Sequence, residues 1–173
     1  MMAPVSRIPS RSVIFDRSQT ASYVDCATHP LPQDFDKDAL ALYLAIMRPA
    51  PKWLNGMLFI RDRMVRPFGL KTVGGFGGSP PLLPLQAGDR LDIFTVKHSA
   101  PDELTLFIED THLDVFVSVI RADHGTGKAV HMATTVHTHN SLGKFYMLFV
   151  GPLHRILVKH MLTRAGGSGL LPL

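Results

Sequence analysis

The stretch Asn140–Arg164 reads NSLGKFYMLFVGPLHRILVKHMLTR, and its residue spacing decides the fold that the chain predicts. Apolar and aromatic residues recur in steps of three and four, as on one face of a helix, at Leu142, Phe145, Tyr146, Phe149, Leu153, Ile156 and Leu157. The segment therefore predicts one long C-terminal helix whose apolar face is buried.

The ends and the middle of this helix carry their own signals. Asn140 or Ser141 can accept hydrogen bonds from the first free amides, and two glycines after Arg164 favour a stop. Pro152 lies inside the pattern. Because its nitrogen cannot donate to the carbonyl of Leu148, a bend is expected there.

Most of the preceding chain predicts a sheet that can receive this helix. Four runs have strand composition: Arg90–His98, Glu103–Glu109, His112–Arg121 and Lys128–His139. The connections between them are short, which implies antiparallel hairpins. Period-two alternation is clearest at Leu113, Val115, Val117 and Val119.

The N-terminal part predicts one more strand and two helices. Residues 1–20 are polar and basic without a pattern, so a loose arm is expected. Ser22–Ala27 predicts a strand that ends before Pro30. A helix follows over residues 36–47, capped by Asp36 or Asp34, and a second helix is predicted over residues 52–66.

This order predicts the α+β class, with a curved antiparallel sheet wrapped on the long C-terminal helix and two short helices after the first strand. The arrangement is similar to the helix-grip fold of START and Bet v 1-like proteins, in which a cavity often remains between sheet and helix. We expect a single domain over residues 21–165, between a flexible arm (1–20) and a flexible tail (166–173).

Composition narrows the classes of function. The 173 residues carry a net charge of only +4, and no Lys/Arg run is interleaved with aromatics, so nucleic acid is not an expected partner. The single cysteine excludes an internal disulfide and fits a reducing compartment. No secretory signal or transmembrane segment is recognisable, so a cytoplasmic location is expected.

Three strings carry a resemblance to a known family. They are RDRMVRPFGLKT from Arg61, DTHLDVFVSV from Asp110, and TTVHTHNSLGKFYMLFVGPLHRILV from Thr134. Together the chain from Tyr23 to Arg164 resembles DUF2867, a bacterial family of unassigned function. The resemblance implies a helix-grip-like domain, met alone or joined to a nucleotide-binding domain, and it implies no reaction. No strand of this sequence is followed by a dinucleotide fingerprint.

One pair of residues has the composition of an acid–base site. His112 and Asp114 stand two apart on a predicted strand and so share a face. In a cavity the carboxylate would fix the imidazole tautomer for catalysis. The structural alternative is favoured because the opposite face of the strand is wholly aliphatic and should pack under the helix, which leaves the pair towards water.

A second set of histidines has the composition of a metal site. His137 and His139 share a strand face, and His131 points the same way. No cysteine or further ligand motif accompanies them, and the sequence departs from the family pattern at His137 and His139. We interpret them as exposed residues at a strand end, and neither a metal nor another cofactor is expected.

The preferred hypothesis is the binding of a small hydrophobic or amphipathic molecule in a cavity between sheet and helix. The candidate ligand-binding residues are Trp53, Thr135, Tyr146, Phe149 and His154, with His112 as a further polar group. A cyclase-, isomerase- or hydrolase-like enzyme using His112 and Asp114 is the first alternative. A membrane-surface or protein interaction module is the second, and formation of a homodimer stays open.

Overall fold

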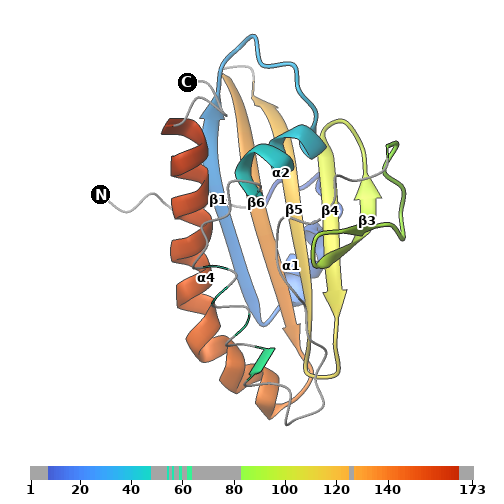
Figure 1. Cartoon of the computed structure of the whole chain (residues 1–173), viewed down its shortest axis with the longest axis vertical. Helices are drawn as coiled ribbons and strands as arrows, with labels where there is room; N and C mark the ends of the chain where they lie inside the picture. The colour runs from blue at the N-terminus through green and yellow to red at the C-terminus, as the bar shows by residue number, and fades with distance from the viewer. Residues whose placement is uncertain are drawn as a thin grey trace.

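The computed structural model describes residues 8–47, 54, 56, 59, 62–63, 83–124 and 127–167. Its strands form one antiparallel sheet in the order β1-β6-β5-β4-β3-β2 (Figure 1). The strands are β1 (Tyr23–Leu31), β2 (Arg90–Leu91), β3 (Phe94–Ser99), β4 (Glu103–Glu109), β5 (Leu113–His124) and β6 (Gly127–Thr138). The first strand thus pairs with the last one, and β1 and β2 are the two edges.

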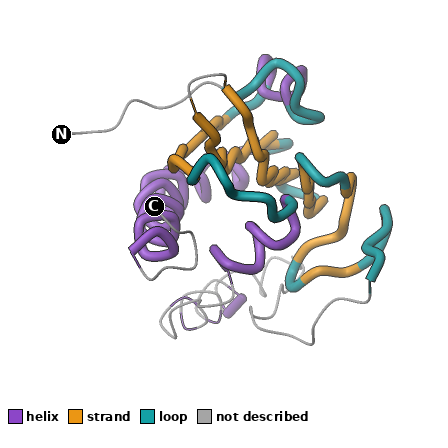
Figure 2. Tube along the Cα trace, turned by 90° about the horizontal axis from the view of Figure 1, so that it is seen from above, coloured by secondary structure: helices purple, strands orange, loops and turns teal. Residues whose placement is uncertain are grey.

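Helices lie on both faces of this curved, unclosed sheet. They are α1 (Phe15–Thr20), α2 (Ala39–Met47) and α4 (Ser141–Gly167). Figure 2 shows α2 and α4 on one side of the sheet and the short α1 on the other. The predicted α+β class, with a curved antiparallel sheet and a long C-terminal helix, is confirmed.

Two strand boundaries differ from the prediction. β1 continues through Pro30 to Leu31, whereas the sequence predicts its end before this proline. Proline is tolerated there because β1 is an edge strand and needs no hydrogen bond on its open side. The run Arg90–His98 is divided between β2 and β3 by a turn at Asp92, whose φ of 54° lies in the left-handed region.

The two predicted helices after β1 are described to different extents. α2 is capped by Asp38, whose Oδ1 accepts a hydrogen bond from the Ala41 amide at 2.8 Å, so the predicted caps Asp36 and Asp34 were wrong. In the second helix, only Leu54, Gly56, Phe59, Asp62 and Arg63 are described, and they are helical. Trp53 lies outside the described residues.

The sheet has an apolar core on each face. On the α2/α4 face, Val117 and Val119 of β5 pack in one cluster with Met161 and Leu162 of α4. On the α1 face, Ile14 packs with residues that alternate with the first set, Cys26, Phe116, Ile120 and Ala133. The aliphatic face of β5 therefore lies towards the helices, as expected.

Helix α4 begins as predicted but buries a different face. The Gly143 amide donates to Oδ1 of Asn140 at 3.0 Å, which confirms Asn140 as the N-cap. The predicted apolar stripe was wrong, because most of it points to solvent. We name the exposed large apolar residues of α4 the outer stripe; they include Leu148, which the predicted stripe lacks. Its members and their exposed fractions are Phe145 (63%), Leu148 (68%), Phe149 (63%), Leu153 (43%) and Ile156 (67%).

The face that α4 turns to the sheet consists of small and apolar residues. Its C-terminal half places Val158, Met161, Leu162 and Ala165 in the core. In its N-terminal half, a Cβ atom at Gly143 would overlap the carbonyl oxygen of His112. This glycine lets the helix backbone approach the sheet closely.

Residues 8–20, which the sequence indicates to be a loose arm, pack on the outer face of the sheet. Ile14 is fully buried. The buried carboxylate of Glu103 accepts hydrogen bonds from the Ser12 hydroxyl at 2.6 Å and from the Val13 amide at 3.1 Å. On the same face, Ser118 Oγ donates to Glu103 at 2.6 Å. One buried carboxylate thus ties this segment to β4 and β5.

Candidate functional site

The candidate site lies between the sheet and the N-terminal half of α4. Several apolar side chains of the helix and of the sheet are only partly buried at this end, in contrast to those around Met161. The helix contributes Tyr146, Met147 and Val150, and the sheet contributes Ile108 and Val115, which pack at the margin of the core. Apolar surface on both layers therefore stays accessible at this end of the molecule.

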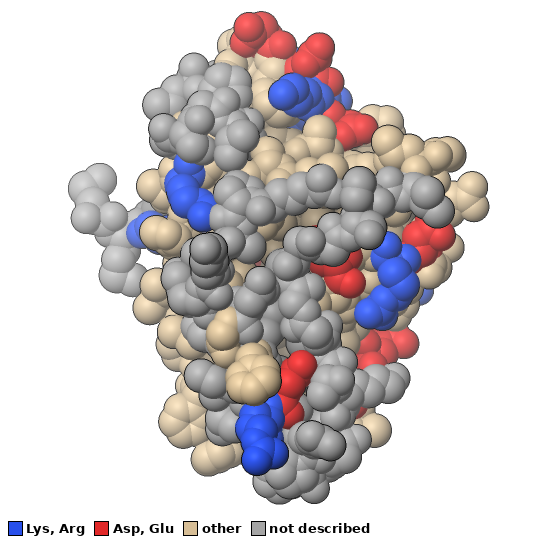
Figure 3. Space-filling model, in the orientation of Figure 1, with Lys and Arg blue, Asp and Glu red and all other residues tan. Residues whose placement is uncertain are grey.

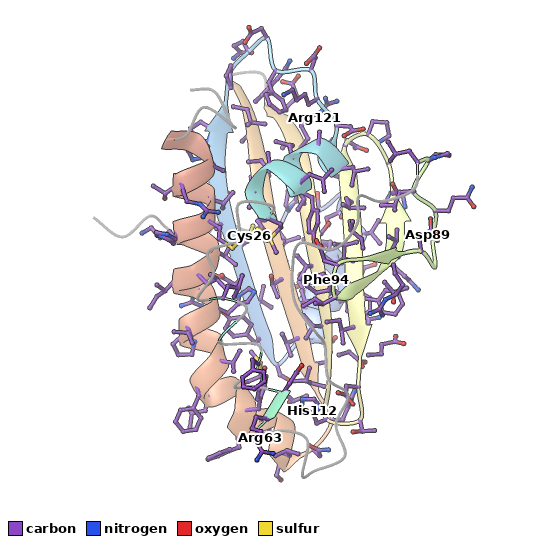
Figure 4. The ribbon with its side chains drawn as sticks, viewed as in Figure 1. Cys26, Arg63, Asp89, Phe94, His112 and Arg121 are labelled. Atoms are coloured by element: carbon purple, nitrogen blue, oxygen red, sulfur yellow. The ribbon has the colours of Figure 1, made fainter. Side chains whose placement is uncertain are left out.

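A buried imidazole–carboxylate pair lies at this end. His112, immediately before β5, has its Nδ1 atom 3.6 Å from Oδ2 of Asp110, and their side chains are 1% and 2% exposed. The other carboxylate oxygen of Asp110 accepts a hydrogen bond from the Thr111 amide at 2.7 Å. Figure 4 shows His112 and Arg63 at the same end of the sheet.

Tyr146 of α4 faces His112. The two rings meet edge to face, with centroids 5.7 Å apart and an interplanar angle of 85°. Of the predicted ligand-binding residues, Tyr146 is therefore brought together with the predicted polar group His112. The backbone supports this contact, because the His139 amide donates to the carbonyl of His112 at 2.9 Å just before α4 begins.

A second polar cluster lies along the seam between α4 and β1. The Tyr23 hydroxyl donates to the carbonyl of Gly151 at 2.9 Å, and Nε of Arg155 donates to Asp25 at 3.2 Å. His154 lies between them, with its ring edge-to-face against Tyr23 at 6.3 Å. Asp25 is 3% exposed. These contacts fix the position of α4 against the edge strand.

Burial governs the titration of the groups in this seam. Desolvation lowers the pKa of His154, an effect that Asp25 opposes and Arg155 reinforces. Burial, followed by the nearby Asp25 carboxylate, raises the pKa of Tyr23. The same two causes raise the pKa of the Cys26 thiol to about 12, so this cysteine is a protonated thiol at neutral pH.

The predicted partner of His112 is engaged elsewhere. Asp114 lies on the α1 face, where its Oδ1 is 3.0 Å from Nε2 of His139. His112 instead precedes the strand and pairs with Asp110. The alternation that places residues two apart on one face does not hold at a strand start, so the spacing of His112 and Asp114 selected the wrong carboxylate.

The other candidate residues are dispersed. His137 contacts the Thr20 hydroxyl at 3.3 Å, and His131 contacts that of Thr28 at 2.8 Å. Within the described part of the chain, no group of three or more metal-ligating side chains gathers. Thr135 is fully buried opposite Phe116, which places it on the α1 face. Phe149 belongs to the outer stripe and faces solvent.

A separate hollow lies at the other end of the sheet, beside the β5–β6 turn. Its volume is about 330 Å³, and it is lined by Arg11, Phe35, Asp36, Asp102, Arg121, Ala122, Asp123 and Lys128. Its cations already have partners. Arg121 donates to the carbonyls of Asp36 and Lys37, and Lys128 donates to that of Phe35. These bonds anchor the β1–α2 connection, and the carboxylates of Asp36, Asp102 and Asp123 in the same lining balance its positive charges.

The family of the chain follows from a comparison with family models. The model described as "Protein of unknown function (DUF2867)" matches residues 17–161. The chain belongs to the DUF2867 family. This confirms the predicted resemblance, and the matched region contains both polar clusters, at His112 and at His154. No curated protein matches this DUF2867 chain. Among its described helices, none has both the length and the apolar character needed to cross a bilayer.

Four residues of the two clusters were missed by sequence reasoning: Asp110, Tyr23, Asp25 and Arg155. Asp110 stands in the acidic pair that directly precedes the strand with His112, and this adjacency was its available signal. Tyr23 and Asp25 alternate on β1, but nothing in the sequence indicates that the edge strand lies beside α4. Their role depends on the pairing of β1 with β6, which is a long-range contact.

Proposed function

We propose that this DUF2867 domain binds a small hydrophobic or amphipathic molecule between the sheet and the N-terminal half of α4. The observation that carries the proposal is the set of apolar side chains on both layers that remain partly exposed at this end of the molecule, with Val115 on β5 and Met147 on α4. A ligand would remove this surface from water, at about 25 cal/mol per Å².

The polar end of the ligand would lie at the pair of His112 and Asp110. A buried imidazole can donate or accept a hydrogen bond, and the neighbouring carboxylate favours one tautomer. Tyr146 would cover the adjacent part of the ligand with its ring. A hydroxyl, carbonyl or carboxylate at one end of an otherwise apolar molecule matches this arrangement.

Two substitutions at one position test the site. Val115→Phe adds volume to the space between sheet and helix, whereas Val115→Ala enlarges it at the same point. Native mass spectrometry of the protein purified from its own host would identify any co-purifying molecule. Titration with a fluorescent fatty-acid analogue would measure affinity in both variants.

We expect Val115→Phe to weaken binding at least tenfold and Val115→Ala to retain it. The outer stripe is a second apolar surface that could take up the probe, so each titration is repeated in the Phe145→Ser/Phe149→Ser background. Equal affinity of both Val115 variants in that background, with both folded, would overturn the proposal.

A second candidate function is acid–base catalysis on the bound molecule, and the burial of the His112–Asp110 pair is the observation that favours it. His112 would transfer the proton, and Asp110, in place of the predicted Asp114, would orient the imidazole. The co-purified molecule would be incubated with the wild type and with His112→Gln. A product mass that forms only with the wild type supports catalysis, and an unchanged molecule in both leaves binding alone.

A further inference from the structure

The outer stripe is the largest group of exposed apolar side chains on any one described element. The other large exposed apolar residues, Val13, Phe59 and Leu83, come from three separate segments. The stripe follows α4 in steps of three and four from Phe145 to Ile156, so its five members form one continuous band. A band of this kind on a helix marks an interaction surface.

The charge around the band has one sign. Lys144 and Lys159 lie along one flank of it, and both are exposed, whereas Arg155 on the same flank is paired with Asp25. The sequence of α4 contains no aspartate or glutamate. Figure 3 shows the same distribution, because the lower left edge, where α4 runs, is tan and the red carboxylates lie elsewhere on this face.

We propose that the outer face of α4 docks on a membrane surface that contains anionic lipids. The helix would lie in the plane of the interface, with Phe145, Phe149 and Ile156 towards the acyl chains and the flanking cations among the lipid headgroups. This mode requires no membrane-spanning segment. It rests on the exposed face of α4 alone and is independent of the proposed ligand site on the opposite face.

Charge favours a lipid surface over a second copy of the chain. The five side chains of the outer stripe, exposed at 43–68%, offer apolar surface that either occupant could cover. Two copies joined through α4 would bring their cationic flanks together without a carboxylate on either helix, whereas anionic lipids supply the opposite charge.

Vesicle flotation tests the proposal with the whole chain. The probes are vesicles of phosphatidylcholine alone and vesicles with 30% phosphatidylglycerol, each at low and high salt. We expect binding to the anionic vesicles that is weakened by salt, and a loss of at least tenfold in Phe145→Ser/Phe149→Ser. Lys144→Glu/Lys159→Glu should lose the preference for anionic vesicles.

The matched control is Leu83→Ser, which removes an apolar side chain that is 73% exposed outside α4. It should bind as the wild type does. Thermal unfolding measures whether each variant is folded. We expect all of them to fold, because every substituted residue is exposed. Binding that the double serine variant retains would overturn the proposal. So would a dimer, detected by sedimentation, that forms through these residues while vesicles bind nothing.

Discussion

Burial of His154 between β1 and α4 takes an imidazole out of water, and this makes its charged form costly. Desolvation is the largest cause of its lowered pKa, and the positive charge of Arg155 acts in the same direction. The Asp25 carboxylate opposes both, but its charge is shared with Arg155 through a 3.2 Å hydrogen bond. The folded state therefore holds His154 neutral in a pH range where the unfolded chain takes up a proton.

The first prediction concerns pH. Because the folded pKa of His154 lies below its unfolded value of about 6.5, the free energy of unfolding should be fully retained above pH 6.5. It should fall as the pH drops from 6.5 towards the folded pKa, by at most about 1.4 kcal/mol per pH unit for one histidine. His29, whose pKa burial also lowers, adds to this slope.

The measurement is urea unfolding between pH 5 and pH 8. His154→Gln should flatten the slope below pH 6.5 without removing it, since His29 remains. His160→Gln, at an exposed position on the same helix, is the control and should leave the slope as in the wild type. An identical slope in His154→Gln and the wild type would show that His154 is not held neutral.

A second prediction at this scale concerns Glu103. Its carboxylate accepts hydrogen bonds from Ser12, Val13, Thr105 and Ser118, all of them donors. Glu103→Gln removes the negative charge that strengthens these hydrogen bonds, and it places an NH₂ group at the position of Oε2, against the Val13 amide. The substitution should cost about 2 kcal/mol of unfolding free energy. Thermal or urea unfolding measures this. Glu109→Gln, at an exposed position of the same strand, should change stability by less than 0.5 kcal/mol.

At the scale of elements, the position of α4 is decided by small residues as much as by apolar ones. The sequence predicted its extent well, as Asn140–Arg164 against Ser141–Gly167. It could not predict the buried face, because α4 carries apolar residues on opposite sides, with Ile156 on one and Val158 on the other. Periodicity alone does not choose between two such stripes, and the close approach at Gly143 became visible only in three dimensions.

For the strands as well, local sequence signals predicted some features correctly, whereas features that depend on long-range contacts were missed. β4 was predicted with its correct ends, because turn residues delimit it on both sides. Pro30 misled the prediction of β1, since its tolerance depends on an edge position that the sequence does not reveal. The prediction of the candidate site was limited in the same way. Tyr146 was assigned correctly to the sheet side of α4, whereas Thr135 required knowledge of which face of β6 meets α1.

The prediction at this scale concerns the replacement of two glycines by alanine. Gly143→Ala should destabilise the protein by about 2 kcal/mol or more, because the new methyl group overlaps the backbone oxygen of His112 and neither backbone can move freely. The control is Gly56→Ala, at a helical position with no atom within 4 Å of the added Cβ, which should stabilise by up to about 1 kcal/mol. Chemical unfolding measures both. The two changes in stability should have opposite signs, and a gain in stability for Gly143→Ala would refute the close approach.

At the scale of the whole molecule, the sheet needs cover on both faces. α2 and α4 cover one face, and the segment 8–20 covers part of the other by burying Ile8 and Ile14 against Phe116 and Ile120. The predicted domain, 21–165, leaves this segment outside. The contacts of Ser12 and Val13 with Glu103 join it instead to the middle of the sheet. From these contacts we expect a folding unit that begins near Ile8.

The last prediction concerns a deletion of the N-terminal segment that covers this face of the sheet. Deletion of residues 1–14 should lower the free energy of unfolding by on the order of 4 kcal/mol, because it exposes the cluster around Ile120 and takes two donors from a buried carboxylate. Deletion of residues 1–7 alone is the control and keeps all of these contacts. Urea unfolding of both proteins, each combined with Glu103→Gln, forms a double-mutant cycle. The glutamine should cost much less in the shorter protein, since the Val13 amide that its NH₂ group would face is gone, and so is the Ser12 donor to the lost charge. Additive effects would instead mean that Glu103 stabilises β4 and β5 without the N-terminal segment, and that the domain begins near residue 21.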